Sequence, residues 1–342
     1  DLDRDGFFGD DEVVGRTPAG AGLTVRRAQA RDGFLLDGPT LGLDYLHPSA
    51  EDLAVPIAVA ADDQVRASLD EEFFDPGYGV LGLYNAANLL EHTQGYFFGL
   101  EPFDEDKTQV LFVHGAGGTP RDWKFLVDGL DRTKFQPWFF YYPSGLPLER
   151  SGAILAEGIE RAVGDPDFEL ERLVVVAHSM GGLVARAALA RLTAAGRPRY
   201  LEAFVSLSTP YGGHDAAQAG IERAPEAIPA WYDLAPASPF LQRLAATPLP
   251  EDLPFFLLFG YRYPGRLQVG PSSDGVITLR SELELAVQLQ ATRSLGFDAT
   301  HTGILESSRV RQVLNELIAP AAPPSGLLDE SLGAMKRVLP LP

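Results

Sequence analysis

A run of ten residues near the middle of the chain constrains the fold more than any other part of the sequence. Residues 174–183 read Val-Val-Val-Ala-His-Ser-Met-Gly-Gly-Leu, so an apolar run passes directly into a serine and then into small residues. This order predicts a buried strand that turns sharply into a helix, with Ser179 at the apex. Ala177 and Gly181 lie two residues before and two residues after the serine, and their small size allows the strand and the helix to approach closely.

The residues after 107 continue this alternation of apolar and amphipathic stretches. Strands are predicted at residues 110–113, 137–142, 173–177, 204–207 and 255–259, and helices at residues 120–131, 148–163, 182–192 and 306–318. Continuously apolar strands that alternate with helices are typical of a mostly parallel sheet with helices on both faces. Residues 210–250 interrupt the alternation with a long, Pro-rich segment, which predicts a functional insertion such as a lid.

The composition excludes several classes of partner and site. The 342 residues carry a formal net charge of −19, and residues 1–106 alone hold 22 acidic and 6 basic side chains. Such a surface repels phosphate backbones, so no nucleic-acid partner is expected. The chain has no cysteine, which excludes a thiol nucleophile, a disulfide framework and a Cys-ligated metal. The apolar run Phe255–Phe259 is far too short to span a bilayer, so no transmembrane segment is expected.

The turn at Ser179 points to covalent chemistry. A serine at a sharp strand-to-helix turn is the nucleophile elbow of serine hydrolases, here with Ala177 in place of the usual first glycine. A buried serine that only caps the helix would not need small residues on both sides. Because a serine is a weak nucleophile at neutral pH, the chain should also supply a base and an orienting acid.

Three motifs together give the chain a wider resemblance. They are His-Gly-Ala-Gly-Gly at 114–118, the elbow at 177–182 and Leu-Ser-Thr-Pro-Tyr-Gly-Gly at 207–213. Residues 107–320, about two thirds of the chain, resemble bacterial lipases and esterases of the α/β-hydrolase superfamily, and the last motif is similar to that of triacylglycerol lipases and inositol-deacylase-like hydrolases. The resemblance implies an α/β-hydrolase fold: a mostly parallel central sheet with helices on both faces, a lid insertion and an N-terminal extension.

The base and the acid are expected after the serine, because this fold orders its triad as Ser, acid, His. Of the six histidines only His214 and His301 follow the serine. His301 lies in the loop before the last predicted helix, where the resemblance places the base, whereas His214 adjoins the 207–213 motif. Asp274, in Ser-Ser-Asp-Gly-Val-Ile, resembles the acid loop of many lipases. Its rivals are Asp298, which is only three residues from His301, and Asp233 in the insertion.

The reacting carbonyl of the substrate needs hydrogen-bond donors and an apolar cleft. The backbone N–H of the residue after the nucleophile, Met180, is one expected donor to the oxyanion. The resemblance places the second donor at Ala116, in the loop after the first predicted strand. Aromatic side chains in and near the insertion are candidates for the cleft, although such residues are more often part of the core. The candidates for substrate binding are Tyr211, Trp231, Tyr232 and Phe240.

The first twelve residues carry a second motif. Aspartates at positions 1, 3 and 5, a glycine at 6 and a glutamate at 12 have the spacing of an EF-hand-type calcium loop. The predicted ligands are the side chains of Asp1, Asp3, Asp5 and Glu12 and the backbone carbonyl of Phe7. No flanking helix is evident, and an acidic, solvated terminus is the alternative. A structural Ca²⁺ is therefore expected, whereas the ester chemistry itself needs no cofactor.

These observations divide the chain into four regions and predict one activity. The regions are the acidic calcium loop at 1–16, an N-terminal extension at 17–106, the catalytic domain at 107–320 with its lid at about 210–250, and a Pro-rich tail at 321–342. The predicted activity is that of a serine carboxylic-ester hydrolase, an esterase or lipase that forms an acyl-enzyme from apolar esters. An acyltransferase or amidase with the same triad, or a catalytically idle ligand-binding relative, is the alternative. No signal for the oligomeric state is present.

The compartment is predicted from weaker features. A chain that begins at Asp1 is consistent with a removed signal peptide or with a cloning boundary. An acidic, Cys-free chain with a calcium loop suits a calcium-rich surrounding. The expected location is therefore outside the cytoplasm, as a secreted, periplasmic or lipid-anchored protein.

Overall fold

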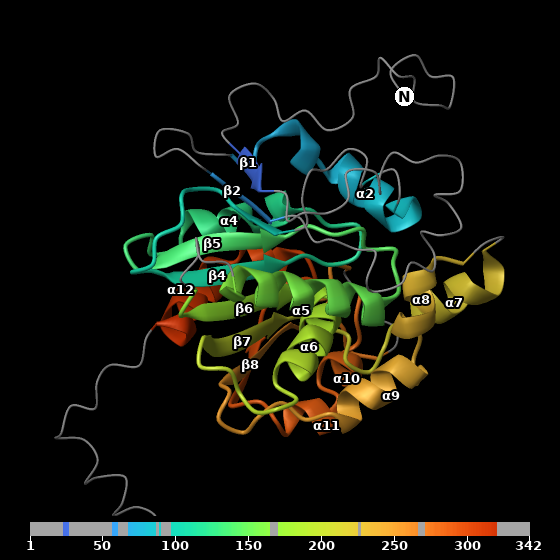
Figure 1. The fold of residues 1–342 in the computed structure, drawn as a ribbon. Coiled ribbons are helices and arrows are strands. Elements are labelled where there is room, and N and C mark those ends of the chain that lie inside the picture. Colours follow the sequence, from blue (N-terminus) through green and yellow to red (C-terminus); the bar gives the residue numbers. More distant parts are fainter. Residues whose placement is uncertain are drawn as a thin grey trace, which may run out of the picture.

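A single sheet forms the centre of the molecule. The structure, a computed structural model, describes residues 23–26, 57–60, 68–86, 89, 97–164, 170–224, 227–265 and 271–319. Within these ranges nine strands pair in the order β1-β2-β3-β5-β4-β6-β7-β8-β9 (Figure 1). They are β1 (Leu23–Arg26), β2 (Ile57–Ala60), β3 (Phe97–Gly99), β4 (Thr108–Val113), β5 (Phe135–Phe140), β6 (Leu173–His178), β7 (Leu201–Leu207), β8 (Phe255–Gly260) and β9 (Arg293–Phe297).

The direction of the strands confirms the mostly parallel sheet. Strands β5, β4, β6, β7, β8 and β9 run parallel to one another. Strand β3 pairs antiparallel with β5, and β1 pairs antiparallel with β2. All the parallel strands therefore end at one edge of the sheet, which is where ligands bind in folds of this type.

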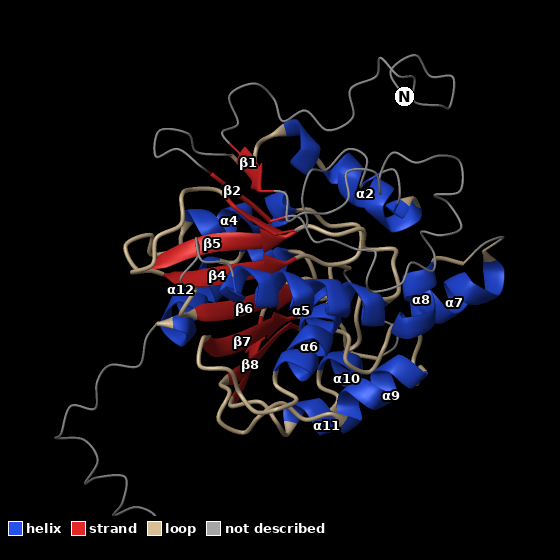
Figure 2. Ribbon diagram, viewed as in Figure 1, coloured by secondary structure: helices blue, strands red, loops and turns tan. Residues whose placement is uncertain are grey.

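Helices cover both faces of the sheet (Figure 2). They are η2 (Glu72–Phe74), α2 (Pro76–Tyr84), η3 (Pro120–Trp123), α4 (Lys124–Asp128), α5 (Leu148–Gly164), α6 (Met180–Leu192), α7 (Asp215–Arg223), α8 (Pro229–Leu234), α9 (Pro239–Ala246), α10 (Leu279–Glu282), α11 (Leu285–Gln288), η4 (Gly303–Glu306) and α12 (Ser308–Ile318). In β4, Leu111 and Val113 pack with α5 and α6, whereas Val110 and Phe112 pack with α4 and α12. Because successive side chains point to opposite faces and both faces are buried, the strand is apolar from Val110 to Val113.

Several element boundaries differ from the predicted ones. The helix predicted at 120–131 is η3 followed by α4, and it ends at Asp128 because the N–H of Gly129 turns back to the carbonyl of Leu126. The strand predicted at 137–142 is β5, whose pairing with β4 runs from Phe135 to Phe140. Strand β9 was not predicted, since as an edge strand it exposes most of its side chains and has no continuous apolar run.

The insertion at 210–250 folds into α7, α8 and α9 beside the carboxyl ends of the strands (Figure 1). Helix α8 is joined to the loop that follows β5. The N–H of Ala230 donates to the carbonyl of Gly145 at 3.0 Å, and the N–H of Leu148 donates to Asp233 Oδ2 at 2.7 Å. The insertion therefore lies at the same edge of the sheet as Ser179, and its role as a lid stays a prediction.

Part of the predicted N-terminal extension is packed against the loop after β4. The hydroxyl of Thr119 donates to the carbonyl of Phe74 at 2.8 Å, and Arg121 donates to the carbonyls of Leu69 and Glu71 at 2.9 and 2.8 Å. The predicted calcium loop at 1–12 and the tail at 321–342 lie outside the described residues. Across the described ranges, no helix combines the length and the apolar character needed to cross a membrane.

Candidate active site

Ser179 occupies the sharp turn between β6 and α6. Its backbone has φ 53° and ψ −132°, a conformation that residues other than glycine rarely adopt. The N–H of Ser179 donates to the carbonyl of Leu207 at 2.8 Å, and the N–H of Gly182 donates to the carbonyl of Ser179 at 2.9 Å. These two bonds hold the turn in its strained form and fix the serine at the carboxyl edge of the sheet.

The glycines after the serine leave no room for a side chain. A Cβ atom at Gly181 would lie 2.2 Å from the carbonyl oxygen of His114, and one at Gly182 would lie 1.9 Å from Thr209 Oγ1. Ala177, in the strand before the turn, is fully buried. The small residues of the sequence motif therefore allow α6 to pack directly against the ends of β4 and β7.

Three side chains from three different segments form one hydrogen-bonded series. The Nε2 atom of His301 lies 2.8 Å from Ser179 Oγ, and its Nδ1 atom lies 2.5 Å from Asp274 Oδ2. The backbone N–H of His301 also donates to the carbonyl of Asp274 at 3.0 Å. With Nδ1–H donated to the carboxylate, Nε2 carries the lone pair that can accept the serine proton.

Asp274 is buried but remains the ionised member of the series. Its Oδ1 accepts the backbone N–H groups of Val276 at 2.9 Å and Ile277 at 2.7 Å. Burial alone would raise the pKa of Asp274. The hydrogen bond and charge of His301, together with the two backbone donors, outweigh burial and hold this pKa below its usual range.

The two rival acids have other partners. Asp298 is exposed and accepts two hydrogen bonds from Arg262, at 2.8 and 2.7 Å. Asp233 accepts the N–H of Leu148 at the start of α5, where a carboxylate satisfies a helix N-terminus. The structure therefore brings Asp274 to His301, whereas Asp298 and Asp233 are bound to other groups.

Two further histidines support the surrounding loops. The Nε2–H of His178 donates to the carbonyl of His301 at 2.9 Å, a contact that the sequence did not indicate. His114 donates from Nδ1 to the carbonyl of Gly115 at 2.9 Å and accepts the N–H of Tyr142 at Nε2. Burial is the main reason that the pKa falls to about 3 for His178 and to about 4 for His114, so both are neutral at neutral pH.

The loop at 114–118 lies directly against the serine. A Cβ atom at Gly115 would be 2.9 Å from Ser179 Cβ and 3.4 Å from its Oγ. The loop is held in place because the N–H of Gly117 donates to Ser144 Oγ at 2.9 Å. The two predicted oxyanion donors adjoin this contact, since Ala116 is an exposed residue of the loop and Met180 is the first residue of α6. The first N–H groups of a helix have no acceptor within the helix.

Three of the four predicted substrate-binding aromatics lie in or against one core cluster. Tyr211 and Phe240 are buried in the core, and Trp231 is half-buried against Gly220. Tyr232, on α8, is 57% exposed. Core packing therefore accounts for Tyr211 and Phe240, and Tyr232 alone of the four presents most of its side chain to solvent.

Glu282 is a residue of the site that the sequence did not reveal. It is 1% exposed, and one of its oxygens, an oxygen of Asp274 and a ring nitrogen of His301 lie within 4.8 Å of one another. Such a group could hold a metal ion in principle. Here both ring nitrogens of His301 are already engaged, by Asp274 and by Ser179, so we assign no metal to it.

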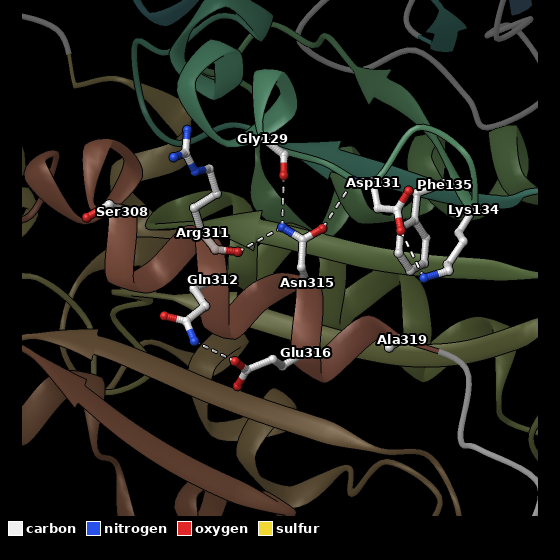
Figure 3. A pocket seen from close by; sticks show the side chains of 10 residues that line it. All are labelled: Gly129, Asp131, Lys134, Phe135, Ser308, Arg311, Gln312, Asn315, Glu316 and Ala319. Atoms are coloured by element: carbon white, nitrogen blue, oxygen red, sulfur yellow. Dashed lines mark hydrogen bonds and ion pairs between the residues drawn. The ribbon is translucent and has the colours of Figure 1, made fainter.

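Figure 3 shows a surface pocket that none of the three residues of the series lines. It is lined by residues of α12 and of the segment that leads into β5, including Phe135, the first residue of that strand. The pocket therefore lies at the amino edge of the sheet, opposite the serine. Asn315 in its wall donates to the carbonyl of Gly129 at 3.0 Å, and Lys134 pairs with Asp131 at 2.9 Å. Its polar groups are thus largely satisfied by one another.

Comparison with known proteins supports this architecture. A model of the Alpha/beta hydrolase family matches residues 110–293. The mature form of Bacillus licheniformis lipase BlEst2 is 18% identical, with a TM-score of 0.50, over 65% of this chain and 98% of that chain. A gene product of Listeria innocua is 14% identical with a TM-score of 0.49, over 64% of this chain and 96% of that chain. No curated protein matches the sequence. The likeness to the first of these structures shows a shared fold.

Proposed function

The chain belongs to the alpha/beta hydrolase family, and from this premise we propose that it is a serine carboxylic-ester hydrolase of the esterase or lipase type. One observation carries the proposal: Ser179, His301 and Asp274 form a continuous hydrogen-bonded series at the carboxyl edge of the sheet. The serine is at a strained turn, its partner imidazole is correctly oriented, and the acid is buried and ionised. This is the arrangement that converts a weak nucleophile into a reactive one.

In the proposed reaction, Ser179 Oγ attacks the ester carbonyl while Nε2 of His301 takes the serine proton. The carbonyl oxygen becomes an oxyanion, which the N–H groups of Ala116 and Met180 would stabilise. His301 then gives the proton to the leaving alcohol, and an acyl-enzyme remains on the serine. A water molecule, deprotonated by the same imidazole, attacks the acyl-enzyme and releases the acid.

Asp274 and His178 would hold the imidazole in place during these steps. Asp274 fixes the Nδ1–H tautomer of His301 and stabilises the imidazolium that forms when the serine proton is taken. His178 binds the backbone carbonyl of the same histidine. Because burial keeps His178 neutral, it can play this part without adding a positive charge next to the imidazolium.

The proposed substrates are apolar esters. Helices α7, α8 and α9 stand at the edge that carries the serine, and their exposed Tyr232 can contact an apolar chain. Val80 and Tyr84 on α2, which packs on the 114–118 loop, are also exposed. The neighbour from Bacillus licheniformis is described as a lipase. A series of p-nitrophenyl esters of increasing acyl length should show where the preference lies.

The test of the proposal is hydrolysis of a short p-nitrophenyl ester by the wild type and by Ser179→Ala. The activity of the variant should be lower than that of the wild type by about 10⁴-fold or more, because triad residues act as a unit. Ordinary turnover by Ser179→Ala would sink the proposal. Products formed in the presence of competing alcohols or amines would show whether acyl transfer or amide chemistry accompanies hydrolysis.

We also propose that the loop at residues 1–12 binds a structural Ca²⁺ and that the protein acts outside the cytoplasm. The spacing of the acidic residues supports the first statement. The second rests on the first together with the acidic, Cys-free composition. Fractionation of the producing cells tests the location, and recovery of the protein in the cytoplasmic fraction would contradict it.

A further inference from the structure

Glu282 is a buried carboxyl group that the proposed mechanism does not use. In the described part of the chain, no group meets full hydrogen-bond geometry with either of its carboxyl oxygens, although Ser208, Asp274 and the backbone N–H of Gly260 lie near them. Its backbone position is fixed from the preceding residue, because Ser281 Oγ donates to the carbonyl of Gly213 at 2.6 Å and the N–H of Gly212 donates to the carbonyl of Ser281 at 3.0 Å. A carboxyl group that is buried without donors takes up a proton rather than remain charged.

The neighbourhood of Glu282 decides which of two close carboxyl groups holds the proton. Oxygens of Glu282 and Asp274 lie within 4.8 Å of each other in a buried site, so both cannot easily be ionised. Asp274 receives N–H donors from Val276, Ile277 and His301 and is therefore the charged one. Burial, and then the charge of Asp274, raise the pKa of Glu282 to about 9.

Ser208 fixes the direction of the hydrogen bonding around Glu282. The N–H of Gly260 donates to Ser208 Oγ at 3.1 Å, so the hydroxyl hydrogen of Ser208 is left to donate elsewhere. The hydroxyl of Ser208, the carboxylate of Asp274 and the backbone N–H of Gly260 surround Glu282, and a ring nitrogen of His301 lies within 4.8 Å of it. A neutral Glu282 can accept from Ser208 through one oxygen and donate from the other, and the ionised Asp274 can only accept.

We propose that Glu282 is held as a neutral acid whose carboxyl O–H donates a hydrogen bond to the ionised Asp274, and that it thereby positions the carboxylate that orients His301. The inference rests on the proposed function of the Ser179, His301 and Asp274 series. Glu282 touches neither the substrate nor the reacting atoms, so it is a positioning residue that acts through Asp274.

Among the titratable groups around this site, Glu282 is the one that gains a negative charge as the pH rises above neutral. Asp274 and His301 face it from the loops after β8 and β9. Beyond them lie His178 at the end of β6 and His214 before α7, and burial lowers the pKa of both. Loss of the Glu282 proton would put a second negative charge next to Asp274, and the repulsion would displace the acid from its histidine.

Kinetics of Glu282→Met and Glu282→Gln against pH test the proposal. Methionine keeps the volume and removes the donor, and should lower kcat about tenfold, the cost of one lost hydrogen bond to a charge. KM for a short p-nitrophenyl ester should stay within about twofold. Glutamine can still accept from Ser208 and donate to Asp274, so it should restore most of the loss. The wild-type rate should fall as pH rises through about 9, and the glutamine variant should lack this fall.

An infrared difference spectrum between the wild type and Glu282→Gln gives a readout that does not depend on turnover. At neutral pH it should contain the carbonyl band of a neutral carboxylic acid, which a carboxylate band replaces at alkaline pH. Absence of the acid band, or equal rates and equal alkaline limbs in all three proteins, would overturn the role of Glu282. If the role of Glu282 is overturned while Ser179→Ala is inactive in the same assays, the proposed function still stands. If Ser179→Ala is active, the proposed function itself fails.

Discussion

Backbone strain at single residues marks the edge of the sheet where the chemistry is proposed. Ser179 has φ 53° after β6, and Ser208 has φ 45° after the neighbouring strand β7. Non-glycine residues keep such conformations only where the surrounding structure enforces them, and they concentrate at functional sites. The first of these serines carries the proposed nucleophile, and the second faces the buried carboxyl of Glu282.

The choice between two aspartates is a prediction at the scale of one residue. Asp274→Asn should lower kcat by about 10⁴-fold, because an amide stabilises the wrong tautomer of His301. Asp298→Asn is the matched control. It makes the same change at an exposed residue bound to Arg262, and it should alter the rate by no more than about twofold. Rates on a short p-nitrophenyl ester check both, and a larger effect at Asp298 would move the acid assignment there.

Buried neutral histidines should make the folded protein less stable as the pH falls. His114 has a pKa of about 4 because burial disfavours its charged form, whereas an unfolded histidine titrates near 6.5. Below about pH 6.5 the unfolded chain therefore binds more protons, and the free energy of unfolding should fall by up to about 1.4 kcal/mol per pH unit down to about pH 4. This stability is fully present above pH 6.5.

Urea unfolding of the wild type and of His114→Gln at pH 7, 6 and 5 measures how much His114 contributes to the pH dependence of the free energy of unfolding. The variant should lose stability less steeply as the pH falls, because glutamine does not titrate and can replace both hydrogen bonds of the imidazole. Parallel pH dependence in the two proteins would show that His114 is not the group responsible.

Local motifs in the sequence predicted the three residues that the structure brings together as a candidate triad. Ser179 lies between small residues, and Asp274 and His301 lie in loops that resemble those of lipases. Glu282 has no such signature. Its proposed role depends on the fold of the segment, because α10 brings it next to Asp274, which lies eight positions earlier in the chain. The same holds for His178, whose contact with the carbonyl of His301 joins segments that are distant in sequence.

At the scale of elements, α2, in the N-terminal part of the chain, packs directly against the 114–118 loop, which carries one of the proposed oxyanion donors. A Cβ atom at Gly79 would lie 2.3 Å from the carbonyl oxygen of Gly117, whereas one at Gly77 in the same helix would meet nothing within 4 Å. Gly79→Ala should therefore displace the 114–118 loop, lower kcat about tenfold and lower Tm. Gly77→Ala should keep the rate and raise stability by about 0.5–1 kcal/mol, as alanine favours a helix. Equal rates in the two variants would contradict this role of α2.

The central strands were predictable because of where they lie. Strands such as β4 and β6 are buried on both faces, so each contains an unbroken apolar run, 110–113 in β4 and 173–177 in β6, that stands out in the sequence. Strand β9 lies at the edge, and its mostly exposed side chains leave no such run. The short helices α10 and α11, of four residues each, are too brief to show a helical period.

Across the whole molecule, acidic charge is concentrated in the first third of the chain. If residues 1–12 bind calcium, Tm should rise with free calcium, by an amount equivalent to about 2.7 kcal/mol at a concentration of 100 Kd. The double variant Asp3→Ala with Glu12→Ala should abolish the calorimetric heat of binding. Asp10→Ala with Asp11→Ala removes the same charge from positions that are not ligands and should retain the heat. No heat in the wild type would leave the segment as a solvated acidic terminus.

The central claim is that Ser179 is the nucleophile of a serine hydrolase. A fluorophosphonate reacts preferentially with a serine that a neighbouring base activates, so labelling followed by peptide mapping tests this claim most directly. The wild type should gain one phosphonyl group, located on Ser179, with loss of esterase activity in proportion to labelling. Ser179→Ala and His301→Ala should remain unlabelled while still folded. An unlabelled wild type, or an adduct on another residue that accounts for the lost activity, would contradict the account.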